Sequence, residues 1–405
     1  MNDPVLERIA REDPAVGSRA DTANELLTRL RHEIDCADAA AAARVSALSR
    51  LARVAVPAVA ALVTIAVTAA ALGLLGHATR PSSPASRPTP PVTAVAVGAA
   101  RVAPGTEALL AHGGALWVAG AHSLERLDPM HGAVEAKIRL PIEGLAAGVA
   151  FGAGSGWVAS GGGNTGRAPS LVRIDPATGQ ILATIDATGS GGGRVRVLSG
   201  GIAFAAGRVW LSRDSTASRG EVISVDPATN RVDGESVAGG IGPEAVLAAF
   251  GSLWVDNTGR TVGTPPAAPL PASVARIDPR TRQVTTEPFA GAPSAGFGSL
   301  WVRGDQAITR YDPSTGATIA RIDVPGVIAV AFGDGRVWAL AGVTDAARND
   351  GSTATLIQID PRSNRIVGTP THLQTPQPIA VAVSGHELWI ADYDGGLLHF
   401  TLTRH

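Results

Sequence analysis

Residues 298–305 read GSLWVRGD, and residues 308–316 read ITRYDPSTG. Apolar residues flank the tryptophan of the first stretch, and in the second they alternate with polar residues up to Asp312, as in β-strands. An aspartate before a proline marks a turn, because its carboxylate binds the backbone two residues on and the proline ring presets φ. The predicted unit has four strands, A to D, at Ala292–Gly298, Ser299–Asp305, Ala307–Pro313 and Thr318–Val324.

This unit recurs along the chain. The motif around the tryptophan appears at Trp117, Trp157, Trp210, Trp254, Trp301, Trp338 and Trp389, and Asp-Pro follows at Asp128, Asp175, Asp226, Asp278, Asp312 and Asp360. Successive tryptophans are 37 to 53 residues apart (Trp301 to Trp338 and Trp157 to Trp210), and propeller blades repeat at roughly 40–50 residues. We therefore predict an all-β, seven-bladed β-propeller. Its tryptophans fill the seams between blades, and its aspartates serve the turns between strands C and D and not a metal ring.

Closure of the ring is predicted from a surplus strand at one end and a missing strand at the other. The seventh unit has strands at Pro378–Gly385, Glu387–Tyr393 and Leu397–Leu402, and no fourth strand follows. The strand-like segment Val92–Gly98 (VTAVAVG) precedes the first unit. If it pairs with Leu397–Leu402 as the outer strand of blade 7, no long sheet edge is left bare.

The succession of GxLWV and xxRIDPxTGxV resembles the repeats of YVTN-type propeller proteins, to which virginiamycin B lyase-like proteins are related. The resemblance covers roughly residues 92–402. It implies a propeller fold and a protein that is exported or attached to a membrane. It implies little about activity, because a propeller hosts many functions.

A membrane anchor is predicted before the propeller. Residues 54–76 (VAVPAVAALVTIAVTAAALGLLG) contain no charge, and a helix of that length crosses a bilayer core of roughly 30 Å. A cleaved signal peptide is the alternative, but a long segment precedes the apolar run and no clear cleavage site follows it. Arg44, Arg50 and Arg53 lie just before the span, so the positive-inside rule places the N-terminus in the cytoplasm.

The predicted organisation therefore has four parts. They are a cytoplasmic helical segment (1–53), a transmembrane helix (54–76), a linker rich in Pro and Ser (77–91) and the extracytoplasmic propeller (92–405). In the first part, Thr22 and Glu25 form a candidate capping box before an apolar stripe. That stripe packs on a neighbouring helix or docks a cytoplasmic partner.

Composition narrows the classes of function. The formal net charge is −1, and the basic residues form no cluster on the propeller, which disfavours nucleic-acid binding. The only cysteine is Cys36, so the propeller holds no internal disulfide and no cysteine-based metal site. The histidines are scattered and match no catalytic motif. We predict a binding or scaffolding module with no catalytic residues, metal or cofactor, the alternative being a metal-dependent lyase like virginiamycin B lyase.

Ligand-binding residues are expected where strand B ends, because the B–C and D–A loops of a propeller gather on one face. These residues are Arg213, Asp214, Arg219, Asp256, Asn257, Arg260, Arg303, Asp305, Asp392, Tyr393 and Asp394. The B–C connections are long in blades 2, 3, 4 and 6. Blades 3 and 4 combine length with charge, so contacts to an extracytoplasmic ligand or protein partner are predicted there. Thr261–Pro271 is alternatively an insertion with no contact role.

Overall fold

The computed structural model describes residues 92–142, 145–160, 170–187, 195–196, 201–215, 220–262, 268–342 and 353–404. The predicted cytoplasmic segment, transmembrane helix and linker (residues 1–53, 54–76 and 77–91) lie outside these ranges, as does Arg219. Within them, no helix has both the length and the apolar character needed to cross a bilayer.

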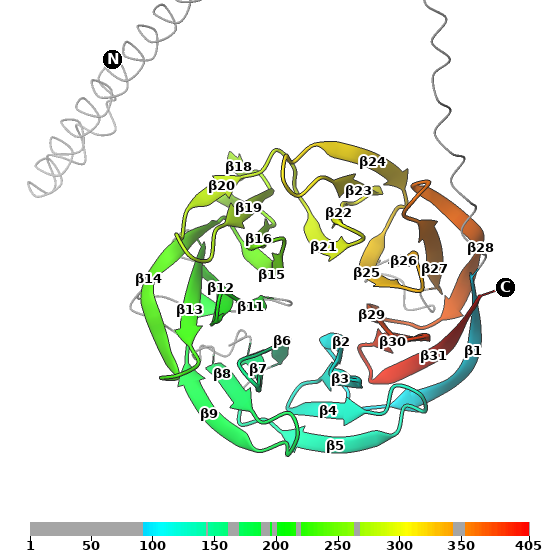
Figure 1. The fold of residues 1–405 in the computed structure, drawn as a ribbon, viewed down its shortest axis with the longest axis horizontal. Coiled ribbons are helices and arrows are strands. Elements are labelled where there is room, and N and C mark those ends of the chain that lie inside the picture. Colours follow the sequence, from blue (N-terminus) through cyan, green and yellow to red (C-terminus); the bar gives the residue numbers. More distant parts are fainter. Residues whose placement is uncertain are drawn as a thin grey trace, which may run out of the picture. The chain divides into compact units, whose positions relative to one another are not determined.

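Seven antiparallel sheets form a ring, each with its strand A near the centre and its strand D at the rim (Figure 1). Blade 1 contains β2 (Ala108–His112), β3 (Ala115–Ala119), β4 (Ser123–Leu127) and β5 (Val134–Arg139). Blade 2 contains β6 (Ala146–Gly152), β7 (Ser155–Ser160), β8 (Ser170–Ile174) and β9 (Ile181–Asp186). Blade 3 contains β10 (Val195–Arg196), β11 (Ile202–Ala205), β12 (Arg208–Ser215), β13 (Gly220–Asp226) and β14 (Arg231–Gly240).

Blades 4 to 7 repeat this plan. Blade 4 contains β15 (Pro243–Ala249), β16 (Ser252–Asn257), β19 (Ser273–Ile277) and β20 (Val284–Thr286), and blade 5 contains β21 (Ala292–Gly296), β22 (Ser299–Arg303), β23 (Ala307–Tyr311) and β24 (Thr318–Asp323). Blade 6 contains β25 (Val327–Gly333), β26 (Arg336–Gly342), β27 (Thr353–Asp360) and β28 (Arg365–Gln374). Blade 7 contains β29 (Pro378–Ser384), β30 (Glu387–Asp392), β31 (Gly396–Arg404) and β1 (Val92–Arg101). The chain is thus a seven-bladed β-propeller, as predicted.

The N-terminal strand closes the ring. β1 pairs antiparallel with β31, with Val92 opposite Arg404 and Arg101 opposite Gly396. The register shifts once, between Ala96 and Gly98. Blade 7 is therefore built from both ends of the propeller, which confirms the predicted pairing and leaves its strand C covered on both sides.

The tryptophans fill the seams between blades, as predicted. All seven are buried, and the core divides into clusters that each join neighbouring blades. In the first six blades the indole N–H donates to the carbonyl five residues earlier in the A–B turn, at 3.0 to 3.3 Å. In blade 7, Trp389 donates instead to the Pro129 carbonyl of blade 1 at 2.9 Å. The last seam thus carries a direct hydrogen bond across the point of closure.

Arginines of strand C link neighbouring blades. Arg126, Arg173, Arg276 and Arg310 each lie over the tryptophan of their own blade, 5.0 to 6.0 Å from the ring centroid. Each also donates to the proline carbonyl of the next Asp-Pro turn, at 2.5 to 3.2 Å. Such charged donors satisfy carbonyls that would otherwise be left without a partner near the seam. These four arginines therefore tie blades 1, 2, 4 and 5 to the blade that follows each of them.

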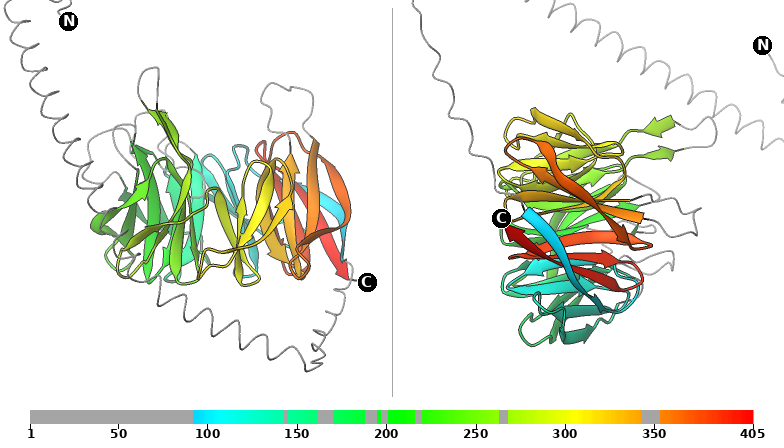
Figure 2. Two further views of the ribbon diagram at one scale, coloured as in Figure 1. Left: turned by 90° about the horizontal axis from the view of Figure 1, so that it is seen from above. Right: turned by 90° about the vertical axis from the view of Figure 1, so that its right-hand side faces the viewer.

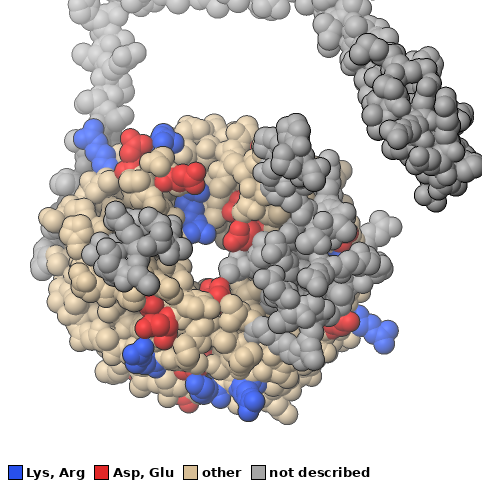
Figure 3. All heavy atoms as spheres, turned by 180° about the vertical axis from the view of Figure 1, so that it is seen from behind, with Lys and Arg blue, Asp and Glu red and all other residues tan. Residues whose placement is uncertain are grey.

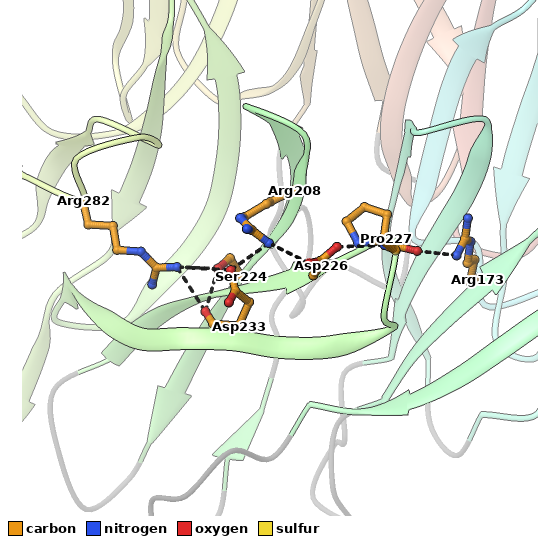
Figure 4. A network of polar contacts seen from close by, with 8 residues as sticks. Arg173, Arg208, Ser224, Asp226, Pro227, Asp233 and Arg282 are labelled. Atoms are coloured by element: carbon orange, nitrogen blue, oxygen red, sulfur yellow. Dashed lines mark hydrogen bonds and ion pairs between the residues drawn. The ribbon is translucent and has the colours of Figure 1, made fainter.

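Blade 3 shows how this link is replaced where the arginine is missing. Ser224 occupies the position of the arginine, and Arg282 reaches back from the C–D turn of blade 4 (Figure 4). Its guanidinium donates to Ser224 Oγ at 3.0 Å and lies 5.5 Å from the Trp210 ring. In blade 7 the equivalent residue is His399, which stacks on Trp389 at 3.9 Å.

The six Asp-Pro turns are also as predicted. Each aspartate accepts the backbone N–H two residues on, at 2.7 to 3.1 Å. These hydrogen bonds hold the pKa of Asp175 and Asp226 below the ordinary value of an aspartate. The pKa of Asp278 is lowered first by the hydrogen bond from the Thr281 N–H and then by that from the Arg280 N–H. The C–D and A–B turns lie at the same end of the strands; we call this side of the ring the turn face, and the opposite side, with the B–C and D–A connections, the loop face.

Candidate functional site

The loop face carries the most elaborate connection among the described residues. Between strands B and C of blade 4, β17 (Arg260–Val262) pairs with β18 (Ala268–Leu270) as a separate hairpin. It projects from the ring (Figure 2). The segment predicted to be either a contact loop or a simple insertion therefore contains a folded element.

A pocket of about 730 Å³ opens on the loop face across blades 4, 5 and 6. Its charged lining residues are Asp256 at the end of β16, Arg303 at the end of β22 and Asp305 just beyond. Small and apolar residues, among them Val327 and Ile328, form much of the rest of the wall. We call this hollow the blade 4–6 pocket. Acidic and basic side chains also surround the central opening in the view of Figure 3.

The alternation of side chains along a strand determines toward which blade the side chains of Asp256 and Arg303 lie. Side chains of a strand alternate between its two faces, so Asp256 shares a face with Trp254, which packs in the seam with blade 5. Arg303 likewise shares a face with Trp301, in the seam with blade 6. Gly291 allows the blade 5 backbone to approach: a Cβ there would lie 2.3 Å from the Arg303 carbonyl oxygen. Each charged side chain thus extends from a buried seam toward the loop face.

Asp256 is a buried carboxylate that has no partner among the described residues. It is 7% exposed, and within the described part of the chain its side chain makes no hydrogen bond and no ion pair. Burial, followed by the charge of Glu244 on β15, raises the pKa of Asp256 to about 6, and Arg303 opposes this shift. A buried charge normally finds a partner, because leaving it unpaired costs free energy.

Arg303 is the complementary group. It is half-buried, and among the residues the structure describes its guanidinium has no hydrogen bond and no carboxylate within 4.0 Å. Burial lowers the pKa of Arg303, while Asp256 and Glu244 raise it. The two groups therefore interact electrostatically across the pocket without touching. Their free donors and acceptors are available to a bound molecule.

The other predicted residues are placed differently. Arg213 is buried and donates to the Ala187 carbonyl at 3.0 Å and to Glu221 at 2.6 Å. Asp392 is buried and accepts from Thr375 Oγ1 and from the Gln377 N–H. These two side chains hold neighbouring segments of backbone.

Three further predicted residues, Asn257, Tyr393 and Asp394, do not line the pocket. Asn257 is fully buried on the opposite side of β16, beside Gly240, and its Oδ1 has no partner among the described residues. Tyr393 and Asp394 are exposed on blade 7, where Asp394 lies 3.4 Å from Arg101. Asp214 and Arg260 lie in strands β12 and β17. The structure thus brings together Asp256, Arg303 and Asp305.

Glu244 was missed by the sequence analysis. It lies on β15, an innermost strand, where small and apolar residues predominate. A carboxylate in the segment PEAVLAA breaks that pattern and was the available signal. As to metal binding, the described residues contain no group of three or more His, Cys, Asp or Glu placed to hold an ion.

The fold and this pocket define a seven-bladed propeller with a charged recess on its loop face. No protein-family model matches the chain, and no curated protein matches it significantly. Among solved structures it is similar to BamB from Moraxella catarrhalis, with a TM-score of 0.50 and 12% identity over 77% of this chain and 99% of that chain. At such identities the likeness establishes the fold alone.

Two other solved structures share the fold. The quinohemoprotein alcohol dehydrogenase from Comamonas testosteroni matches with a TM-score of 0.51 and 12% identity, over 75% of this chain and 68% of that chain. A chain of the Mitotic Checkpoint Complex matches with a TM-score of 0.52 and 15% identity, over 71% of this chain and 86% of that chain. The same fold thus occurs in an enzyme and in a protein assembly, so function has to be argued from the site.

Proposed function

We propose that the chain is a membrane-anchored, extracytoplasmic sensor or scaffold that binds a protein partner through its loop face. The observation that carries the proposal is the pair of charges in the blade 4–6 pocket, Asp256 and Arg303, which have no partner among the residues that the structure describes. On the turn face, by contrast, the strand C arginines and the turn aspartates are engaged within the propeller. Polar groups left without a partner in a folded protein are suited to pair with a bound molecule.

The hairpin β17–β18 supports the same face. A tight connection is enough to join strands B and C, as residues 304–306 show in blade 5. A longer ordered connection costs conformational entropy that the blade itself does not require. We therefore assign the partner contacts to blades 4 to 6, whereas the sequence pattern predicted them on blades 3 and 4. Membership of the YVTN-type propellers belongs to this proposal and rests on the seven repeated motifs.

Site-specific photo-crosslinking in intact cells tests the face. A photoreactive residue at Thr258 or Asp305 probes the loop face, and one at Met130 or Arg280 probes the turn face as a matched control. We expect partner adducts from Thr258 and Asp305 and none from the controls. Adducts that arise only from Met130 or Arg280 would show that the binding face is wrongly assigned.

Two further experiments test the anchor and the alternative function. If residues 54–76 span the membrane with the N-terminus inside, a membrane-impermeant maleimide labels Cys36 only after permeabilisation. Labelling of intact cells would reverse the proposed orientation. Chelation of divalent metals leaves binding by a protein-interaction face unchanged, whereas a loss of function on chelation would favour the lyase-like alternative.

A further inference from the structure

Asp256 and Arg303 line one pocket, carry opposite charges and do not pair with each other. Ion pairs form at other points of the ring, for example between Arg213 and Glu221 at 2.6 Å and between Arg208 and Asp226 at 3.4 Å. Asp256 and Arg303 remain more than 4.0 Å apart, and neither has another side-chain partner in the described part of the chain. The space between them fits a molecule that donates hydrogen bonds on one side and accepts them on the other.

We propose that the blade 4–6 pocket binds a free α-amino acid with an apolar side chain, its ammonium group at Asp256 and its carboxylate at Arg303. This rests on the proposed assignment of the loop face as the binding face. A planar guanidinium with free N–H donors matches a carboxylate, and a buried carboxylate matches an ammonium group. A zwitterion satisfies both protein groups at once.

Ligands with a single charge fit less well. Among the described residues, Arg303 is the cationic side chain that lines the pocket, Asp256 and Asp305 line it as well, and Glu244 acts on both Asp256 and Arg303. An anion therefore meets repulsion from these carboxylates. A simple cation pairs with Asp256 but leaves Arg303 half-buried and unpaired. The net negative surroundings also strengthen the binding of the ammonium end, because Glu244 adds its charge next to Asp256.

Size and lining agree with a small amphipathic ligand. The pocket volume of about 730 Å³ falls within the roughly 300–1,000 Å³ of small-molecule sites. Ala290, Ala292, Val327 and Ile328 contribute an apolar wall beside the two charges. That wall is suited to an aliphatic side chain, and L-leucine is therefore the probe.

Calorimetric titration of the full-length protein with matched probes tests the proposal. L-Leucine carries both charges, L-leucinamide only the ammonium, N-acetyl-L-leucine only the carboxylate, and glucose offers hydroxyl groups alone. We expect L-leucine to bind about tenfold or more tightly than either singly charged analogue, because each lost ion-assisted hydrogen bond weakens binding by about that factor. Equal binding of the analogues, binding of glucose alone, or no binding of L-leucine would each overturn the proposal.

Two variants assign the two ends of the ligand. Asp256→Asn weakens the binding of L-leucine and L-leucinamide about tenfold and does not weaken that of N-acetyl-L-leucine. Arg303→Gln weakens the binding of L-leucine and N-acetyl-L-leucine about tenfold and does not weaken that of L-leucinamide. Asp323→Asn, 83% exposed on the rim, is the control and leaves every affinity unchanged. Loss of all probes in both variants, when neither variant melts below the parent, would contradict the assigned orientation.

The comparison of probes on the parent protein needs no substitution, so it decides the matter even if a variant fails to fold. The experiments also test the two proposals, partner binding and amino-acid binding, independently of each other. If crosslinking finds no partner at Thr258 or Asp305 but L-leucine binds with this pattern, partner binding fails and the ligand site stands. If partner adducts form and L-leucine does not bind, the ligand assignment fails alone.

Discussion

The two faces of the propeller hold their charges in opposite ways. On the turn face, Arg173 stacks on Trp157 and donates to Pro227, and the pKa of Asp226 lies below its ordinary value because a backbone N–H binds the carboxylate. On the loop face, burial raises the pKa of Asp256 and no side chain pairs with it among the described residues. Charges on the turn face hold the ring together, whereas those of the blade 4–6 pocket weaken the free protein and remain available for a ligand.

Opening the ring is the perturbation with the largest expected effect, because closure positions both faces. Deletion of residues 92–98 removes most of β1 and uncovers β31. We expect the melting temperature to fall by more than about 10 °C and the protein to aggregate through the exposed edge. Calorimetry measures the melt, and a deletion of the same length in the linker, residues 82–88, is the control. An unchanged melt would mean that β1 contributes little to closure.

Loss of one turn-face link is expected to have the next largest effect. Arg173→Ala removes the hydrogen bonds to Ser155 and Asn230 together with the contacts to Pro227 and Trp157. We expect the free energy of unfolding to fall by about 2–3 kcal/mol. Chemical denaturation measures it. Arg321→Ala, whose partner Asp323 is 83% exposed, serves as the control. Equal losses in the two variants would remove the distinction between engaged and solvated arginines.

Asp256→Asn is expected to stabilise the free protein at neutral pH. A carboxyl whose pKa is higher in the folded state, here about 6 against 3.8, lowers stability as the pH rises from the unfolded to the folded value. Asparagine does not ionise, so the gain is on the order of 1–2 kcal/mol above pH ~6 and disappears below pH ~4. Denaturation at pH 4 and pH 8 measures the difference. A variant that is no more stable than the parent at pH 8 would argue that burial of the charged Asp256 carboxylate does not destabilise the fold.

Asp312→Asn on the turn face is expected to have the smallest effect, with the opposite sign. Hydrogen bonds from the Ser314 hydroxyl and from the Ser314 and Thr315 backbone lower the pKa of Asp312. Such a group stabilises the fold above its unfolded value near 3.8, and this contribution is lost as the pH falls through the lower folded value. The variant is therefore slightly less stable at pH 7 and loses less stability on acidification. Acid titration of the melting temperature compares it with the parent; identical acid profiles would exclude a role for this charge.

Much of the fold was predictable because its causes are local. Recurring tryptophans such as Trp254 and Trp301 mark strand B of each blade. The Asp-Pro pairs mark the turns, because the aspartate accepts a hydrogen bond from the backbone two residues on. Ring closure by Val92–Gly98 followed from counting strands, and the register with β31 confirms it. The anchor at residues 54–76 is likewise read from the sequence, and it stays a prediction.

The candidate site depended on tertiary structure. Charges at the end of strand B look alike in sequence, but Arg213 lies buried against Glu221, whereas Arg303 faces an open pocket. Glu244 reaches Asp256 from an innermost strand that no local motif marks. The alternation of side chains along one strand is a property of the chain, so the sequence by itself determined the blades. Whether a charge finds a partner depends on the neighbouring blade, and only the assembled ring decided which side chains stay free to bind.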